Sequence, residues 1–168
     1  MMKMALATGM RRGELFRLQW EDIDLHRGFI RITESKGGKA MEIPLNDATR
    51  HLLEGVARTS KYVFPGENGG QRVSAAKASK RIRDRAGLPK SFRPMHGLRH
   101  VFASQLASSG QVDLYVLQRL LTHKSPVMTQ RYAHLRDATL QAASALGGDI
   151  LTKVIEEKPE SKIIKMKR

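Results

Sequence analysis

Apolar residues recur along this chain at two different periods, and the change of period predicts both helices and a strand. Leu98, Phe102 and Leu106 fall at i, i+4 and i+8, which predicts a helix over residues 96–109. In residues 29–33, by contrast, apolar and polar positions alternate, as in a half-buried strand. The chain is therefore expected to combine amphipathic helices with some sheet.

Glycine and helix-capping residues divide the rest of the chain. The glycines within residues 35–39 can supply the positive φ of a hairpin, so residues 40–45 are predicted to return beside residues 29–33. Further helices are expected over residues 1–8, 11–18, 46–58, 73–86, 113–121, from 125, and over 135–146. With no repeat and no internal break, the prediction is one mainly α-helical domain with a small antiparallel β-sheet (α+β class) over residues 1–150. A charged, flexible tail is expected over 151–168.

The charge of the chain narrows the class of partner. Thirty Lys and Arg against sixteen Asp and Glu give a formal net charge of +14, which favours an acidic partner. Nucleic acid is favoured over a membrane surface, because the chain has no long apolar run. Cysteine is absent, which excludes disulfides, thiolate nucleophiles and Cys-based zinc sites. The start of the chain lacks the pattern of a signal peptide, so a cytoplasmic location is expected.

A set of chemically capable residues lies mostly in the second half. His96 and Arg99 are three positions apart, on one face of a helix start, and Tyr132 follows His123 by nine positions. Breaking a phosphodiester without a metal needs a nucleophile, cations, a proton acceptor and a donor for the leaving oxygen. These residues, with Arg11 near the amino terminus, can fill several of those roles.

The segments around these residues resemble the catalytic domain of the tyrosine recombinases, the phage integrase family. Residues 8–15, in which an arginine follows Thr-Gly and precedes Glu-Leu, resemble the family's first arginine box. Residues 96–100 resemble the second box, and residues 120–134 resemble the histidine and tyrosine segments. The resemblance covers about residues 5–146 and implies the DNA breaking-rejoining enzyme fold.

The resemblance also implies a role for each residue. Tyr132 would be the nucleophile, His96 the proton acceptor or a positioning hydrogen bonder, and His123 a hydrogen-bond donor to the phosphate. Arg11, which matches the family's position better than Arg12 does, would form a phosphate clamp with Arg99. The family's hairpin lysine, which protonates the leaving oxygen, corresponds to Lys36, with Lys39 as its rival. His100 is interpreted as a structural histidine that points elsewhere.

The implied reaction is site-specific recombination through a covalent 3′-phosphotyrosine, which integrates or excises mobile DNA. It uses no metal and no cofactor, because the bond energy is kept in the protein–DNA link. The implied partner is double-stranded DNA, bound by four protomers, with residues 135–150 reaching onto a neighbour and DNA-bending proteins as accessories. The resemblance also implies that the chain is of prokaryotic or phage origin and that it is located with the nucleoid.

Several features depart from the family pattern. Thr122 stands where the family has glycine, and Val101 where it has a hydroxyl residue. We also expect the family's amino-terminal DNA-binding domain and the first helix of the catalytic domain to be missing from this chain. Two other functions are therefore considered: a non-catalytic DNA-binding fragment and a type IB topoisomerase-like enzyme.

Overall fold

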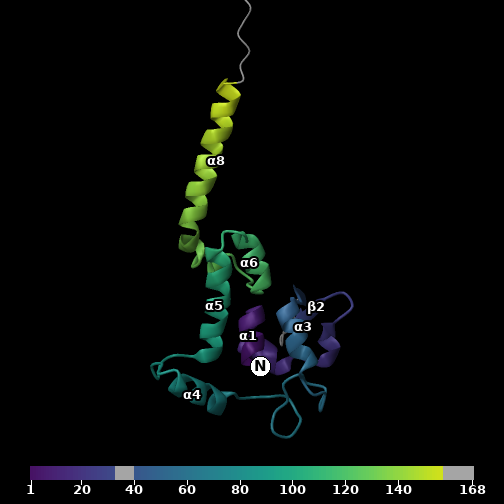
Figure 1. Ribbon diagram of the computed structural model, residues 1–168. Helices are drawn as coiled ribbons and strands as arrows, with labels where there is room; N and C mark the ends of the chain where they lie inside the picture. The colour runs from purple at the N-terminus through teal and green to yellow at the C-terminus, as the bar shows by residue number, and fades with distance from the viewer. Residues whose placement is uncertain (33–39, 157–168) are drawn as a thin grey trace, which may run out of the picture.

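The computed structural model describes residues 1–32 and 40–156 of the chain. It is mainly helical with one small antiparallel sheet, as the sequence predicted, and its last helix leads away from the rest (Figure 1). Within those residues, no helix is both long and apolar enough to cross a membrane. The elements are α1 (Met2–Thr8), α2 (Arg12–Arg17), η1 (Trp20–Asp22), β1 (Ile23–Asp24), β2 (Phe29–Ile32), β3 (Met41–Pro44), α3 (Asp47–Glu54), α4 (Ala76–Arg85), α5 (Pro94–Ser108), α6 (Leu114–Leu120), α7 (Val127–Gln130), η2 (Ala133–Arg136) and α8 (Asp137–Glu156).

The sheet has the strand order β1-β2-β3, and both pairings are antiparallel. Ile30 lies opposite Ile43 on β3 and opposite Ile23 on β1, so the apolar side chains share one face. The expected antiparallel pairing of β2 and β3 is present, but β1 is an addition that the sequence analysis did not predict. A two-residue strand is too short to show an alternating pattern.

Helix boundaries follow local signals. Asn46 caps α3 by accepting a hydrogen bond from the backbone N–H of Thr49 at 2.8 Å, and Asp113 caps α6 in the same way through Val116. Gly9 ends α1 with φ +66°, and a Cβ there would lie 2.5 Å from the ring of Phe102. Glycine is therefore required at this junction for both its backbone conformation and its size.

Several expected boundaries were wrong. Helix α3 ends at Glu54, before Gly55, and not near residue 58. Helix α4 begins at Ala76, later than expected, while α5 begins earlier, with Pro94 in its first turn, where proline is favoured. Helix α8 begins at Asp137 and ends at Glu156, ten residues beyond the end expected at 146.

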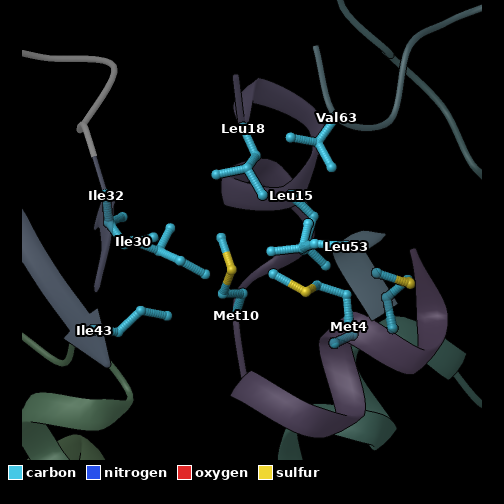
Figure 2. Close-up of a cluster of buried hydrophobic side chains, with 11 residues drawn as sticks. Met4, Met10, Leu15, Leu18, Ile30, Ile32, Ile43, Leu53 and Val63 are labelled. Carbon is cyan, nitrogen blue, oxygen red and sulfur yellow. The ribbon is translucent and has the colours of Figure 1, made fainter. Parts of the chain in front are cut away.

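Two clusters of buried side chains form the core. The larger one joins α1, α2, the sheet and α3, and Figure 2 shows its methionine, leucine and isoleucine side chains pointing toward one another. The smaller one joins α5 to α6 through Ala103, Ala107, Leu117 and Leu121, and it includes Tyr132. Because Met95 at the start of α5 belongs to the larger cluster, α5 connects both and fixes their relative position.

Candidate active site

Five of the six predicted site residues line a single cavity of about 1300 Å³. They come from segments far apart in the sequence: the loop before α2, helix α5, the turn after α6 and the segment after α7. The five are Arg11, His96, Arg99, His123 and Tyr132. Lys36 and its rival Lys39 lie outside the described residues.

Arg11 is held in place before α2 by a carboxylate and a turn. Its Nη1 donates to Glu14 Oε1 at 2.8 Å and to Thr122 Oγ1 at 2.5 Å, and its Nη2 donates to the carbonyl of Thr122 at 3.0 Å. Glu14 also accepts from the backbone N–H of Arg11, which fixes the start of α2. Arg12 lines the same cavity, but its guanidinium lies over the ring of Phe16. Arg11 is thus the arginine tied into the turn that carries His123.

Arg99 is 7% exposed and joins the ends of two helices to α5. Its Nη1 donates to the carbonyl of Gly9 at 2.6 Å, and its Nη2 donates to the carbonyl of Leu121. Burial and the neighbouring Arg11 lower the pKa of Arg99 to about 10, so the guanidinium stays charged at neutral pH. Two guanidinium groups therefore lie beside one cavity, where an anion between them would relieve their repulsion.

His123 follows a residue with an unusual backbone conformation. Thr122 has φ +50°, the left-handed conformation that glycine favours. The side chain of His123 is buried, and its Nδ1 lies 2.7 Å from Thr129 Oγ1. Burial and the charges of Arg99 and Arg11 lower the pKa of His123 to about 4. The imidazole is therefore neutral at pH 7, with one nitrogen held by Thr129 and the other able to hydrogen-bond a ligand.

Tyr132 is 6% exposed and belongs to the smaller core cluster. Burial raises the pKa of its phenol, although the charges of Arg131 and Arg99 act in the opposite direction. Its hydroxyl lies 2.7 Å from Nδ1 of His100, and Nε2 of His100 lies 2.8 Å from Nε2 of His96. The expectation that His100 points elsewhere was therefore wrong: it stands between His96 and Tyr132.

The sequence did contain a signal for His100. His96 and His100 are four positions apart on α5, so both project from the same face of the helix. The contact with Tyr132 itself depends on how α5 packs against the segment after α7, which no local pattern reports. Glu14 lies three positions from Arg11, so its ion pair with that arginine is a local contact that the sequence does indicate. Thr122, which holds Arg11 from 111 positions away, and Thr129, which holds His123, were missed as positioning residues.

The wall of the cavity is strongly basic. Among the described residues that line it there are lysines, arginines and histidines but no aspartate or glutamate. No group of three or more His, Asp or Glu side chains in the described part of the chain is arranged to hold a metal ion. Such a surface is suited to a phosphate-bearing polymer. Besides the five site residues, the basic lining comprises Arg12, Lys77, Lys80, Arg83, Lys90, Arg93, His100 and Arg131.

Comparison with known proteins gives a consistent result. The family model described as "Phage integrase family" matches residues 1–139. The tyrosine recombinase XerC of Xanthomonas campestris pv. campestris is 37% identical over 144 residues, which are 80% of this chain and 43% of that protein. The tyrosine recombinase XerD of Shewanella oneidensis is 36% identical over 155 residues, 84% of this chain and 50% of that protein. The chain thus spans about half the length of the curated relatives it matches.

Solved structures show the same similarity. The XerH site-specific recombinase bound to a palindromic difH substrate, in a post-cleavage complex, matches with a TM-score of 0.68 at 28% identity, covering 88% of this chain and 44% of that one. The catalytic domain of bacteriophage HP1 integrase matches with a TM-score of 0.63 at 29% identity, covering 86% of this chain and 78% of that one. The predicted fold class is therefore confirmed.

Proposed function

The chain belongs to the phage integrase family, and from this membership we propose that it is the catalytic domain of a tyrosine-type site-specific DNA recombinase. The observation that carries the proposal is the convergence of Arg11, Arg99, His123 and Tyr132 on one basic cavity. Two fixed cations, a neutral imidazole and a phenol around one space are suited to attack on a phosphodiester.

In the proposed reaction, Tyr132 Oη attacks a phosphorus atom of DNA and forms a covalent 3′-phosphotyrosine, while the bond to the 5′ oxygen breaks. Arg11 and Arg99 stabilise the charge that develops on the non-bridging oxygens, and His123 donates a further hydrogen bond to one of them. Lys36 protonates the departing 5′ oxygen. The reverse reaction with a new 5′-hydroxyl rejoins the strands, so no high-energy cofactor is consumed.

The proposed partner is double-stranded DNA, bound along the basic wall of the cavity. The XerH structure named above is a complex with its DNA substrate, which supports this choice. Helix α8 leads away from the body of the molecule (Figure 1), and its residues 140–150 are exposed. We assign it to contact with a neighbouring protomer in a DNA-bound tetramer, assisted by DNA-bending proteins at the nucleoid of a prokaryotic cell.

Covalent capture tests the proposed function without knowledge of the target site. The chain is incubated with a pool of nicked duplexes of randomised sequence, in which a cleaved strand loses its short 5′-hydroxyl fragment and cannot be rejoined. We expect a protein–DNA adduct that resists denaturation, and none from Tyr132→Phe. Tyr115→Phe is the matched control, because Tyr115 is 66% exposed and lies outside the cavity lining.

The outcomes separate the alternatives. Absence of an adduct from the unmodified chain, with salt-dependent DNA binding retained, would overturn the proposal in favour of a non-catalytic DNA-binding fragment. An adduct formed on all sequences alike, with relaxation of supercoiled plasmid, would indicate a type IB topoisomerase-like activity instead. Enrichment of particular sequences in the captured pool is the result that supports site-specific recombination.

A further inference from the structure

A chain of hydrogen bonds leads from Tyr132 to the surface through two histidines of α5. Nδ1 of His100 lies 2.7 Å from Tyr132 Oη, and its Nε2 lies 2.8 Å from Nε2 of His96. Tyr132 is buried, His100 is half-buried and His96 is exposed. The spacing of four residues on α5 brings the two rings together edge to face, with their centroids 4.3 Å apart.

Tyr132 needs a proton acceptor before it can attack. Burial raises the pKa of its phenol, so the resting side chain is protonated at neutral pH. Among the described contacts, the group within hydrogen-bond distance of Oη is Nδ1 of His100 and not a nitrogen of His96. His96, the acceptor implied by the family resemblance, reaches the phenol only through the ring of His100.

The charges around His100 keep it ready to accept a proton. Burial lowers its pKa, and the groups that face it act in the same direction: His96 and Arg99 on α5 and Arg131 beside Tyr132. The ring is therefore neutral at physiological pH, and one of its nitrogens carries a free lone pair. A histidine held positively charged could not take this role.

We propose that His100 is the immediate proton acceptor for Tyr132 and that His96 passes the proton on to solvent. This inference rests on the proposed function, in which Tyr132 is the nucleophile. It requires His100 as the Nε2–H tautomer, so that Nδ1 accepts from the phenol and Nε2–H donates to Nε2 of His96. His96 then carries its own proton on Nδ1.

The step balances without a further reactant. As the bond between Tyr132 Oη and phosphorus forms, the phenolic proton moves to Nδ1 of His100. The proton on Nε2 of His100 moves to Nε2 of His96, which releases its Nδ1 proton to water. The bond from phosphorus to the 5′ oxygen breaks, and that oxygen takes a proton from the leaving-group acid. His100 is a catalytic residue in this scheme because it touches the reacting oxygen.

A purely structural His100 would hold Tyr132 in place without accepting its proton, and one substitution separates these roles. His100→Asn keeps a hydrogen-bonding atom near the position of Nδ1 but cannot accept a proton in the physiological range. The rate of adduct formation is measured in single turnover on captured duplexes with a sulfur atom replacing the 5′ bridging oxygen. Because sulfur departs without protonation, this rate reports activation of the nucleophile and not of the leaving group.

For the unmodified chain, we expect the rate to rise with pH and reach a plateau, with its midpoint below the ordinary pKa of histidine. His100→Asn should be at least about 100-fold slower, the usual scale of general base catalysis, and should lose the plateau. His51→Asn is the matched control, because His51 is an exposed histidine of α3 outside the cavity lining. An unchanged rate and pH profile in His100→Asn would overturn the relay while leaving the recombinase function intact.

A second measurement needs no DNA. Nitrogen-15 spectra of the histidine rings, assigned through His100→Asn and His96→Gln, report which nitrogen carries the proton in each. We expect Nε2–H on His100 and Nδ1–H on His96. A proton on Nδ1 of His100 would make it a donor to Tyr132 and overturn the relay. Absence of an adduct from the unmodified chain would instead overturn the proposed function, and the role of His100 with it.

Discussion

Arg11 and Thr122 are 111 positions apart, yet the guanidinium of Arg11 donates to both the hydroxyl and the carbonyl oxygen of Thr122. The hydroxyl in turn donates to Glu14 Oε1 at 3.1 Å, which closes a three-residue network. Thr122 has φ +50°, so a β-branched residue occupies a backbone conformation that is costly for it. The network offsets that cost and fixes one of the two proposed phosphate ligands.

Substitutions at Thr122 should separate its backbone strain from its hydrogen bonds. Thr122→Gly relieves about 1 kcal/mol of strain but loses the bonds of a buried hydroxyl, so we expect a small net change in the free energy of unfolding. Thr122→Val keeps the strain and loses the same bonds, which should cost about 2 kcal/mol. Urea denaturation of the two variants checks this, and equal stabilities would contradict it.

Arg99 should be required for both folding and the chemical step. Arg99→Lys keeps the charge but replaces the planar fork that reaches the carbonyls of Gly9 and Leu121. We expect adduct formation to fall about 100-fold or more, the effect of removing a charge-stabilising donor, with the melting temperature also lowered. Arg12→Lys is the control, since Arg12 contacts neither carbonyl among the described hydrogen bonds, and a loss as large in that variant would argue against the assignment.

The low pKa of His123 makes stability depend on pH. Its pKa is about 4 in the folded chain and about 6.5 in the unfolded one, so below pH 6.5 the unfolded state binds more protons. The free energy of unfolding should therefore fall as the pH drops from about 6.5 toward 4 and level off below. The full shift corresponds to about 3.4 kcal/mol, which screening by solvent reduces to about 2 kcal/mol. His123→Gln should lack this pH-dependent part of the free energy of unfolding, which thermal melts between about pH 6.5 and pH 4 can measure. Parallel pH curves for the two proteins would show that His123 is not held neutral by the fold.

Local signals in the sequence predicted most helices but fewer of the contacts that build the site. The caps at Asn46 and Asp113 and the left-handed turn at Gly9 depend on neighbouring residues, so they could be read directly. Strand β1 was missed because two residues form no pattern, and helix α8 was expected to be shorter than it is.

The residues of the site divide in the same way, into those that local motifs indicate and those that depend on contacts between distant segments. The motifs and the family resemblance that they carry pointed to Arg11, His96, Arg99, His123 and Tyr132, which line one cavity. Their supports were not visible, because the contacts of Thr122 with Arg11 and of His100 with Tyr132 join segments far apart in the chain. Such contacts depend on how the helices pack together, and helix packing produces no local pattern in a single sequence.

Lys36 remains a prediction from the hairpin, and its rival Lys39 can be tested beside it. If Lys36 protonates the leaving oxygen, Lys36→Ala should slow cleavage of an ordinary duplex by about 100-fold or more. Because a bridging sulfur departs unprotonated, the same variant should regain most of its rate on a duplex with that substitution. Lys39→Ala should behave like the unmodified chain on both duplexes. The reverse result would assign the role to Lys39. Unchanged cleavage rates in both variants would show that neither lysine protonates the leaving oxygen.

Helix α8 should be needed for assembly and not for the fold. Its exposed apolar side chains, Leu140, Leu146 and Ile150, fall within about a third of the helix circumference at 100° per residue, so they form one face. An exposed apolar face on a helix that leads away from the body is favourable when a partner covers it. Changing all three to serine should leave the melting temperature nearly unchanged but abolish higher-order complexes on DNA, as measured by light scattering. Lys3→Ser, an exposed substitution on α1, is the control, and complexes of unchanged size in the triple variant would exclude α8 as the contact between protomers.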